Sequence, residues 1–455
     1  MTIEFKKSFL IYLIALIIEF TLLVLVIWHA DWLFSPYLSG FDTFEYTTIA
    51  KNLVENQAFS KSLDHPFVPN FFRSPGYPFW LAFLYLIFNS FTPAIFLGMF
   101  VFSFSASLIY LIMREIFSER LAFWSGIVFA LEPRMAFSAP FILSEQIFLP
   151  IFLASILFAV KFFHNPQKNI FLHLSAILLG VSALVRGVSL YLWPIFVILF
   201  SITLYKKWPL TKIIKTLALS TVIFIFVMSP WLIRNKLTLG TWQPSSLFGL
   251  HLYWGHLETL ERYLGVSQDT VRQEIIDRAF KVAGNNFETP QAVNMLAKEA
   301  ITEIRNNLWA YTKIYIFNTG LFFVTDGYKG IVSYIMDIRP NYVNLGDFIV
   351  TFQFNKLFHY LKTFSFLELA IPIFGRTTWI LLTILGFSGM LISIKETSNQ
   401  RLLLILFSVL IFYFAILTGP IFSPDPRFRM PVNGFLITFA LVAVFKMTGI
   451  NYKHE

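Results

Sequence analysis

Long apolar windows recur along the chain, and they constrain its fold more than any other feature. A helix needs about 20 such residues to cross the hydrocarbon of a bilayer. Ten windows of this kind are predicted to span, at residues 8–29, 93–113, 121–138, 142–163, 170–185, 188–205, 213–232, 376–395, 402–419 and 430–447. Two further apolar segments, 306–325 and 347–373, are interrupted by polar residues and are either a further pair of spans or interfacial helices. The sequence thus predicts an all-α polytopic membrane protein with 10–12 transmembrane helices.

The composition agrees with a membrane protein and excludes several kinds of chemistry. Hydrophobic residues make up 56% of the 455 residues and charged residues only 13%, which is more apolar than a soluble core can bury. The sequence has no Cys, so disulfides, thiolate nucleophiles and Cys-based zinc sites are excluded. The net charge is +9, but the basic residues are scattered between apolar spans, and no nucleic-acid partner is expected. Chemistry must therefore come from carboxylates, His, Lys or Arg.

The positions of Lys and Arg predict the topology. Basic residues recur in alternate gaps between the windows, which the positive-inside rule makes cytoplasmic. These gaps contain Lys6/Lys7, Arg114/Arg120, Lys161/Lys168, Lys206/Lys207/Lys212/Lys215, Lys395/Arg401 and Lys446/Lys453. Both termini are then cytoplasmic, and the first window is too long for a signal peptide and lacks a small-residue cleavage site, so it is predicted to be an uncleaved span.

Three regions follow from this topology. Residues 1–235 form a transmembrane catalytic module that includes a first outer loop at 30–92. Residues 236–305 form an extracytoplasmic helical insert, and 306–455 form a C-terminal transmembrane module. Within the insert, Ser267 is predicted to cap one helix, and Thr289, followed by Pro290, is predicted to cap another.

The stretch GFDTFEYTTIAKNLVENQAFS opens the first outer loop and carries its first carboxylates. It is predicted to be a helix lying flat at the outer interface, with Asp42 near its N-terminus and Glu45 on its solvated face. Asp42 is then either a general base or only the cap of this helix. The residues predicted to face lipid are Phe44, Ile49, Leu53 and Val54.

Five arginines are predicted on the outer side, where the positive-inside rule disfavours them. They are Arg73, Arg186, Arg234, Arg427 and Arg429. Such residues need anionic partners, either Asp42, Glu132 and Glu145 from the protein or a phosphate from a ligand. The structural alternatives are that Arg73 only reaches the interface, and that Glu145 only forms an ion pair with Arg134 or Arg186.

No metal or nucleotide motif accompanies these residues. His251 and His256 are five apart, which does not align them on one face of a helix, so no metal site is expected. A divalent cation held by carboxylates is left open. The sequence has no Gly-rich phosphate loop and no GxSxG motif, and no cofactor is predicted.

Several fragments, in this order, resemble the polytopic C-type glycosyltransferases. They are FDTFEYTTIAKNL, RSPGYPF, LEPRMAFSAPFILSEQIF, GVSALVRGVSL, SPWLIRNKLTLGTW, LFGLHLYWG and PRFRMPV. More narrowly, the chain is similar to the bacterial dolichyl-phosphate-mannose-protein mannosyltransferase-like group, which includes aminoarabinose and lipopolysaccharide core transferases. The resemblance implies the C-type glycosyltransferase fold, with interfacial helices in the first outer loop. It also implies a sugar donor carried on a polyprenyl phosphate, used on the periplasmic face of the bacterial inner membrane.

The resemblance assigns roles to individual residues. Asp42 matches the Asp that deprotonates the acceptor hydroxyl, and the arginines match positions that would bind the donor phosphate during one inverting displacement. The candidate substrate-binding residues are Glu45, Tyr46, Arg73, Tyr77, Glu132, Glu145, Arg186, Arg234, Asn235, Arg427 and Arg429.

The sequence also departs from the family's pattern. Thr43 follows Asp42, where protein O-mannosyltransferases have adjacent Asp and Glu, so a protein acceptor is in doubt and a lipid, glycan or protein is left open. The chain stops soon after Asn451, where aminoarabinose transferases continue into a periplasmic domain. The alternative functions are a transporter of lipid-linked sugars, an O-antigen polymerase or ligase, and a binding protein without activity.

Overall fold

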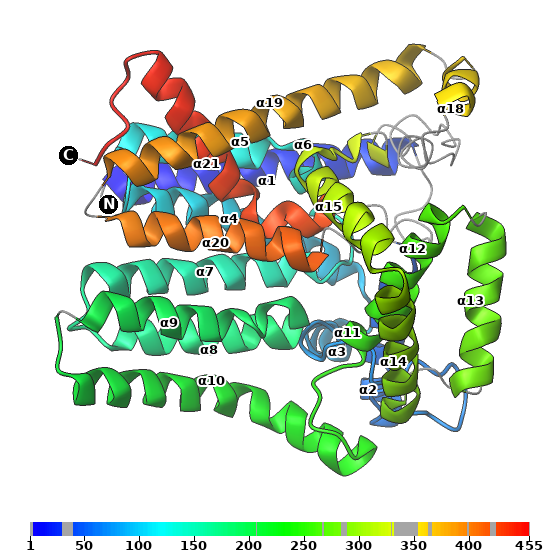
Figure 1. Cartoon of the computed structure of the whole chain (residues 1–455). Coiled ribbons are helices and arrows are strands. Elements are labelled where there is room, and N and C mark those ends of the chain that lie inside the picture. Colours follow the sequence, from blue (N-terminus) through cyan, green and yellow to red (C-terminus); the bar gives the residue numbers. More distant parts are fainter. Residues whose placement is uncertain are drawn as a thin grey trace.

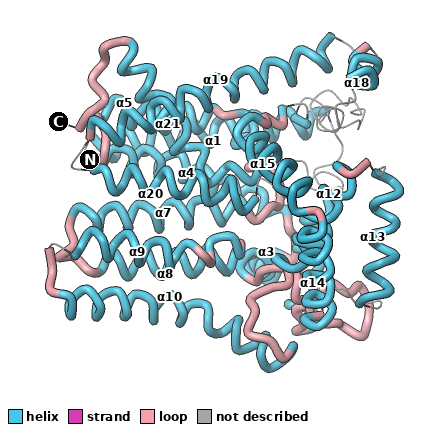
Figure 2. The backbone as a smooth tube through the Cα atoms, viewed as in Figure 1, coloured by secondary structure: helices cyan, strands magenta, loops and turns pink. Residues whose placement is uncertain are grey.

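The computed structural model describes residues 3–29, 40–205, 207–265, 268–283, 289–328, 330–331, 354–362, 366–397, 400–418 and 425–454. Within them the chain is almost entirely helical and forms no β-strand (Figure 2). Eight helices in this part of the chain are long and apolar enough to cross a bilayer. They are α1 (Ile3–His29), α4 (Thr92–Arg114), α7 (Glu145–His164), α9 (Leu192–Tyr205) with the preceding η1 (Gly187–Ser189), α10 (Leu210–Leu239), α19 (Phe366–Glu396), α20 (Arg401–Thr418), and α21 (Met430–Met447) with the preceding η4 (Pro426–Arg429).

The other helices are shorter. They are α2 (Gly40–Asn56), α3 (Gly76–Phe88), α5 (Glu119–Leu131), α6 (Pro133–Ser138), α8 (Ile170–Val185), α11 (Leu247–Leu250), the π-helix η2 (His251–Leu257), α12 (Glu258–Tyr263), α13 (Gln268–Ala283), α14 (Pro290–Asn306), α15 (Leu308–Val324) and α18 (Phe354–Leu361). The chain is therefore a multi-pass, all-α membrane protein, as the sequence predicts.

Two predicted spans form helices that are shorter than a typical membrane span. The window 121–138 divides into α5 and α6, because Pro133 lacks the amide proton that would continue α5 and instead starts α6. The window 170–185 is helix α8, which has only 16 residues. Of the two ambiguous segments, 306–325 is largely helix α15, whereas most of 347–373 before α18 lies outside the described residues.

The long helices run side by side, and the insert lies across one end of them (Figure 1). Helices α11 to α14, together with α2 and α3, gather at that end, and the two ends of the chain lie at the other (Figure 1). The insert has its own apolar core, formed by side chains from α11, η2, α13 and α14, which include Leu250, Tyr253, Leu257, Ile275 and Leu296. As predicted, Thr289 caps α14, since its side chain accepts a hydrogen bond from the amide of Ala292. Ser267 lies outside the described residues.

Helices α19 and α21 approach each other closely at Gly389. A Cβ atom on Gly389 would overlap the carbonyl oxygen of Phe439, a backbone atom that cannot rotate away. We therefore expect Gly389→Ala to destabilise the protein by about 1–3 kcal/mol or more, the usual cost of overpacking a helix contact. Thermal unfolding of the purified protein in detergent measures this loss.

Gly320 in α15 provides the matched control. A Cβ atom there would meet no atom within 4 Å, so Gly320→Ala should leave the melting temperature unchanged or raise it. Equal melting temperatures for the two variants would contradict the close approach of α19 and α21.

Candidate active site

Helix α2 starts the site, because it places Asp42 in its first turn. The predicted helix is present, but one of its predicted lipid-facing residues is buried. Ile49 is fully buried, because Phe59 from the segment that follows α2 and Trp231 of α10 pack against it. Phe44 is exposed, and Leu53 and Val54 are partly buried against the core.

Both carboxylate oxygens of Asp42 face an arginine. Arg73 Nη2 donates to Asp42 Oδ1 at 2.7 Å, and Arg427 Nη1 donates to Oδ2 at 2.9 Å. Burial alone would raise the pKa of Asp42, but the charges and hydrogen bonds of the two arginines outweigh it and lower the pKa to about 2. Asp42 is therefore ionised, and it binds two cations that come from opposite ends of the sequence.

Glu45 holds Arg73 from the other side. Arg73 Nε donates to Glu45 Oε2 at 2.5 Å, and Lys61 Nζ donates to Oε1 at 2.9 Å. Glu45 is only 2% exposed, so the prediction that it lies on a solvated face is wrong. The reason is tertiary: the segment between α2 and α3 brings two cations over this carboxylate, and the helical pattern of α2 contains no sign of them. The Arg73 guanidinium also stacks on the ring of Tyr46 at 4.8 Å.

Glu145, in the first turn of α7, extends this group of charges. It forms an ion pair with Arg186, which follows the last residue of α8, and its Oε1 lies 3.2 Å from Arg427 Nε. Of the two partners considered from the sequence, Glu145 pairs with Arg186, while Arg134 pairs with Asp425 at 3.5 Å. Seven side chains thus form one continuous set of ion pairs, called the Asp42 cluster below: Asp42, Glu45, Lys61, Arg73, Glu145, Arg186 and Arg427.

Two aromatic residues support this cluster. The rings of Tyr46 and Tyr77 make an edge contact at 5.0 Å. The hydroxyl of Tyr77 is fully buried and donates to Gln146 Oε1 at 2.9 Å, which links α3 to α7 directly beside Glu145. Tyr77 therefore joins α3 to α7, the helix that carries Glu145, and its own hydroxyl bonds to an amide rather than to an arginine.

Two other predicted residues lie outside the Asp42 cluster. Glu132 caps α6 by accepting from the amide of Met135 at 2.8 Å. Arg429 is 1% exposed and donates to the carbonyls of Phe322 at 2.5 Å and Thr325 at 2.7 Å, at the end of α15. Both side chains are therefore occupied in holding helix ends.

Arg234 and Asn235 reach the cluster only indirectly. Arg234 Nη1 donates to the carbonyl of Asn70 at 3.2 Å and to Asn235 Oδ1 at 2.9 Å. The side chain of Asn70 in turn accepts from the amide of Arg73 at 2.9 Å. Arg234 thus supports the segment that carries Arg73, and Asn235 donates to the carbonyl of Gln243 at 2.8 Å.

His251, at the start of the insert's π-helix, is a neighbour of the cluster that the sequence did not suggest as a site residue. Burial lowers the pKa of His251 to about 4, with smaller effects from the charges of His256, Arg73, Arg186 and Asp42. In the part of the chain that the structure describes, its ring makes no hydrogen bond, whereas His256 Nδ1 bonds to the hydroxyl of Tyr311 at 2.5 Å. The insert is joined to the segment before Arg73 by the hydrogen bond from the Ser246 amide to the Phe71 carbonyl, at 2.9 Å. The sequence feature that could have pointed to His251 is its place in an otherwise apolar stretch, LFGLHLYWG.

The two insert histidines predict a loss of stability in mild acid. Burial lowers the pKa of both His251 and His256 from 6.5 to about 4, so the unfolded chain takes up protons before the folded one as the pH falls. Stability is then complete above about pH 6.5 and is lost between pH 6.5 and 4, by about 1 kcal/mol per histidine at pH 5 after allowance for partial exposure. Melting temperatures at pH 7 and pH 5 test this. The double variant His251→Gln/His256→Gln should lose less than the wild type, and the exposed His65→Gln should behave as the wild type.

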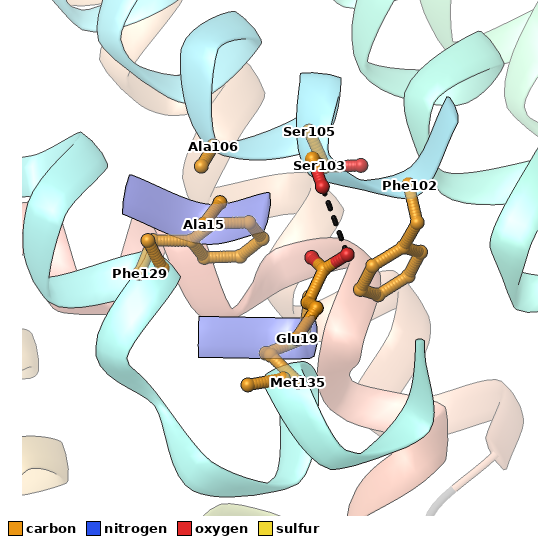
Figure 3. A pocket seen from close by; sticks show the side chains of 10 residues that line it. Ala15, Glu19, Phe102, Ser103, Ser105, Ala106, Phe129 and Met135 are labelled. Carbon is orange, nitrogen blue, oxygen red and sulfur yellow. Dashed lines mark hydrogen bonds between the residues drawn. The ribbon is translucent and has the colours of Figure 1, made fainter. Parts of the chain in front are cut away.

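A small cavity inside the bundle lies apart from the Asp42 cluster. It is bordered by α1, α4, α5 and α6, and Glu19 is buried beside it and accepts from Ser103 Oγ at 2.8 Å (Figure 3). None of its lining residues belongs to the cluster. Among the described residues, no group of three or more His, Asp or Glu side chains could hold a metal ion.

The family comparison covers part of this site. Residues 64–233 match the sequence profile of the family described as dolichyl-phosphate-mannose-protein mannosyltransferase. Over this stretch the chain resembles that family. The resemblance noted from the sequence is therefore confirmed, and the matched residues include Arg73, Glu145 and Arg186 of the cluster. Among curated proteins, none matches the chain.

The fold comparison covers nearly the whole chain. The Archaeoglobus fulgidus oligosaccharyltransferase in complex with Zn and sulfate is 15% identical, with a TM-score of 0.50, over 96% of this chain and 49% of that one. The oligosaccharyltransferase AglB from the same organism, with an inhibitory peptide and a dolichol-phosphate, is 14% identical, with a TM-score of 0.50, over 97% of this chain and 51% of that one. The chain thus spans about half the length of these proteins. At this identity the likeness shows the fold alone, and it confirms the predicted C-type glycosyltransferase fold.

Proposed function

We propose that the chain is a glycosyltransferase that moves a sugar from a polyprenyl-phosphate donor to a hydroxyl group of a lipid, glycan or protein acceptor. The observation that carries this proposal is the Asp42 cluster, in which one ionised carboxylate lies between Arg73 and Arg427 at the end of a membrane bundle. The family resemblance over residues 64–233 and the C-type fold support the same class of reaction.

The charge of the cluster suits an anionic substrate. Four cations, Lys61 and three arginines, face three carboxylates, which leaves one positive charge. A sugar linked to a polyprenyl phosphate carries one negative charge, and its phosphate gains a second as the sugar leaves. Planar guanidinium groups bind phosphate through paired hydrogen bonds, so the arginines suit both the bound donor and the leaving group.

The reaction needs one proton acceptor and one site for the developing negative charge. Asp42 takes the proton of the acceptor hydroxyl while the acceptor oxygen forms a bond to the sugar's anomeric carbon. The bond between that carbon and the phosphate oxygen breaks, and its electron pair stays on the polyprenyl phosphate, where Arg73, Arg186 and Arg427 offset the charge. A single displacement inverts the anomeric centre.

The proposed location is the periplasmic face of a bacterial inner membrane. The basic gaps of the sequence fall towards the bundle end that carries the chain ends, and the cluster and insert lie at the opposite end (Figure 1). By the positive-inside rule the chain ends are then cytoplasmic and the Asp42 cluster faces outward.

Mass spectrometry of envelope glycolipids and glycans tests the proposal. Cells that lack the chain should lose one sugar residue from one product, and the wild-type chain, but not the Asp42→Asn variant, should restore it. An unchanged set of products in cells lacking the chain would refute the proposal, and full restoration by Asp42→Asn would remove Asp42 as the base.

A further inference from the structure

Two of the arginines proposed to bind the donor phosphate already hold a carboxylate. Arg73 Nη2 and Arg427 Nη1 each donate to one oxygen of Asp42, at 2.7 and 2.9 Å. The two oxygens of a carboxylate and two oxygens of a phosphate offer similar acceptors to a guanidinium group. The groups that would receive the donor are thus occupied by the residue that must act as base.

Arg427 has hydrogen-bonding capacity that the protein does not use. Its Nε lies 3.2 Å from Glu145 Oε1, close enough for an ion pair, but within the described residues this buried Nε makes no hydrogen bond. A buried N–H without a hydrogen bond is costly even beside an opposite charge, and a ligand oxygen that accepted from it would reduce that cost. Arg427 therefore donates a hydrogen bond to Asp42, whereas its Nε has only a charge contact with Glu145.

We infer that Asp42 and the donor phosphate are exchangeable partners of Arg73 and Arg427, so that donor binding releases the Asp42 carboxylate for the acceptor. This inference rests on the proposed function and concerns the order of events at the same site. Donor binds first, the arginines turn from the carboxylate to the phosphate, and the freed Asp42 then accepts the proton.

The exchange accounts for the weakness of Asp42 as a base in the unliganded protein. With both arginines in place its pKa is about 2, well below the range in which a general base is effective near neutral pH. Among the described residues, the charges of Glu145 on α7 and His251 on the insert also interact with Asp42, and Glu45 and Tyr46 on α2 share Arg73 with it. Because the arginines are what lower the pKa, their transfer to a phosphate raises the basicity of Asp42 when a donor is present.

The exchange is tested by whether Asp42→Asn tightens or weakens the binding of an isoprenoid phosphate. Farnesyl phosphate, a short isoprenoid phosphate, is titrated into the purified full-length chain in detergent micelles, and its Kd is measured for the wild type and for Asp42→Asn. If Asp42 competes for the arginines in about nine-tenths of the molecules, its removal should tighten binding about tenfold. If Asp42 only helps to build the site, the same variant should bind equally or more weakly.

Asp425→Asn is the matched control. Like Asp42→Asn, it removes one negative charge near Arg427. Asp425, however, accepts hydrogen bonds from the Arg427 backbone amide and from Arg134, and none from the Arg427 side chain. We expect its Kd to tighten by clearly less than the about tenfold of Asp42→Asn, because Asp425 acts on the Arg427 side chain by charge alone and occupies none of its N–H groups. An equal gain for Asp425→Asn and Asp42→Asn would overturn the exchange in favour of a general effect of charge.

Arginine variants separate this inference from the proposed function. Arg186→Gln and Arg73→Gln should both weaken farnesyl phosphate binding if the cluster holds a phosphate. Wild-type binding by both, in protein that elutes as a single folded species, would refute the phosphate site itself. Weakened binding in these variants, with no gain in Asp42→Asn, would overturn only the exchange.

Discussion

Replacing Asp42 with Asn is expected to lower sugar transfer by about 10²–10⁴-fold, the usual contribution of a general base. The amide is nearly the same size as the carboxylate but cannot take up the acceptor's proton. Arg73 keeps its bond to Glu45, and Arg427 keeps its contact with Glu145, so the fold should survive the change. The product is measured by mass spectrometry after incubation of membranes that contain equal amounts of each variant.

Asp425→Asn controls for the loss of a carboxylate near Arg427. It should transfer sugar at close to the wild-type rate. The side-chain oxygen of Asn can still accept the hydrogen bond that the Arg427 amide now donates to Asp425 at 2.8 Å. A rate for Asp42→Asn within about threefold of the wild type would exclude Asp42 as the base, since general-base effects are far larger.

Replacing Arg427 with Gln is expected to destabilise the folded protein by about 3 kcal/mol, near the lower end of the cost of breaking a buried ion pair. Arg427 is shared by Asp42 and Glu145, so its removal takes one positive charge from two partly or fully buried carboxylates. The change should appear as a lower melting temperature in detergent, together with a loss of transfer.

Arg234→Gln is the comparison for this prediction. Arg234 donates to the Asn70 carbonyl and the Asn235 side chain, and it pairs with no carboxylate among the described residues. Its loss should cost about 1 kcal/mol, the value of one ordinary hydrogen bond. If both variants melt at the same temperature, Arg427 does not hold the two carboxylates together.

The fold could be predicted largely from the lengths of apolar windows. The window 170–185 and helix α8 have the same bounds, and the helix that starts near Asp42 is present as α2. The window 121–138 gave the extent of helix but not its division into α5 and α6. Pro133 was the visible signal, and its effect depends on Glu132 capping the second piece.

The candidate site could be predicted only in part, because its geometry depends on tertiary contacts. Arg427 and Arg429 are two residues apart, and such residues point to different sides of a helical turn. Only Arg427 therefore faces Asp42, whereas Arg429 faces the end of α15. The position of His251 depends on how the insert folds across the bundle, which no local pattern in the sequence specifies.

The burial of Glu45 shows the same limit. Its position on α2 gives no indication of Lys61 and Arg73, which lie 16 and 28 residues later. A Glu on a surface helix usually lies on the solvated face. Glu45 is buried instead, because Lys61 and Arg73 from the segment between α2 and α3 both bind its carboxylate.

The shortness of α8 has a consequence for the surrounding lipid. With a rise of 1.5 Å per residue, its 16 residues extend only about 24 Å, against a hydrocarbon thickness of about 30 Å. Where a helix this short crosses the bilayer, hydrophobic mismatch makes neighbouring acyl chains compress or tilt, and we expect the leaflet surface to dip at the helix end. Arg186 lies at that end, and an isoprenoid alcohol phosphate that diffuses within the leaflet would meet the guanidinium by lateral movement, without first rising into the aqueous layer.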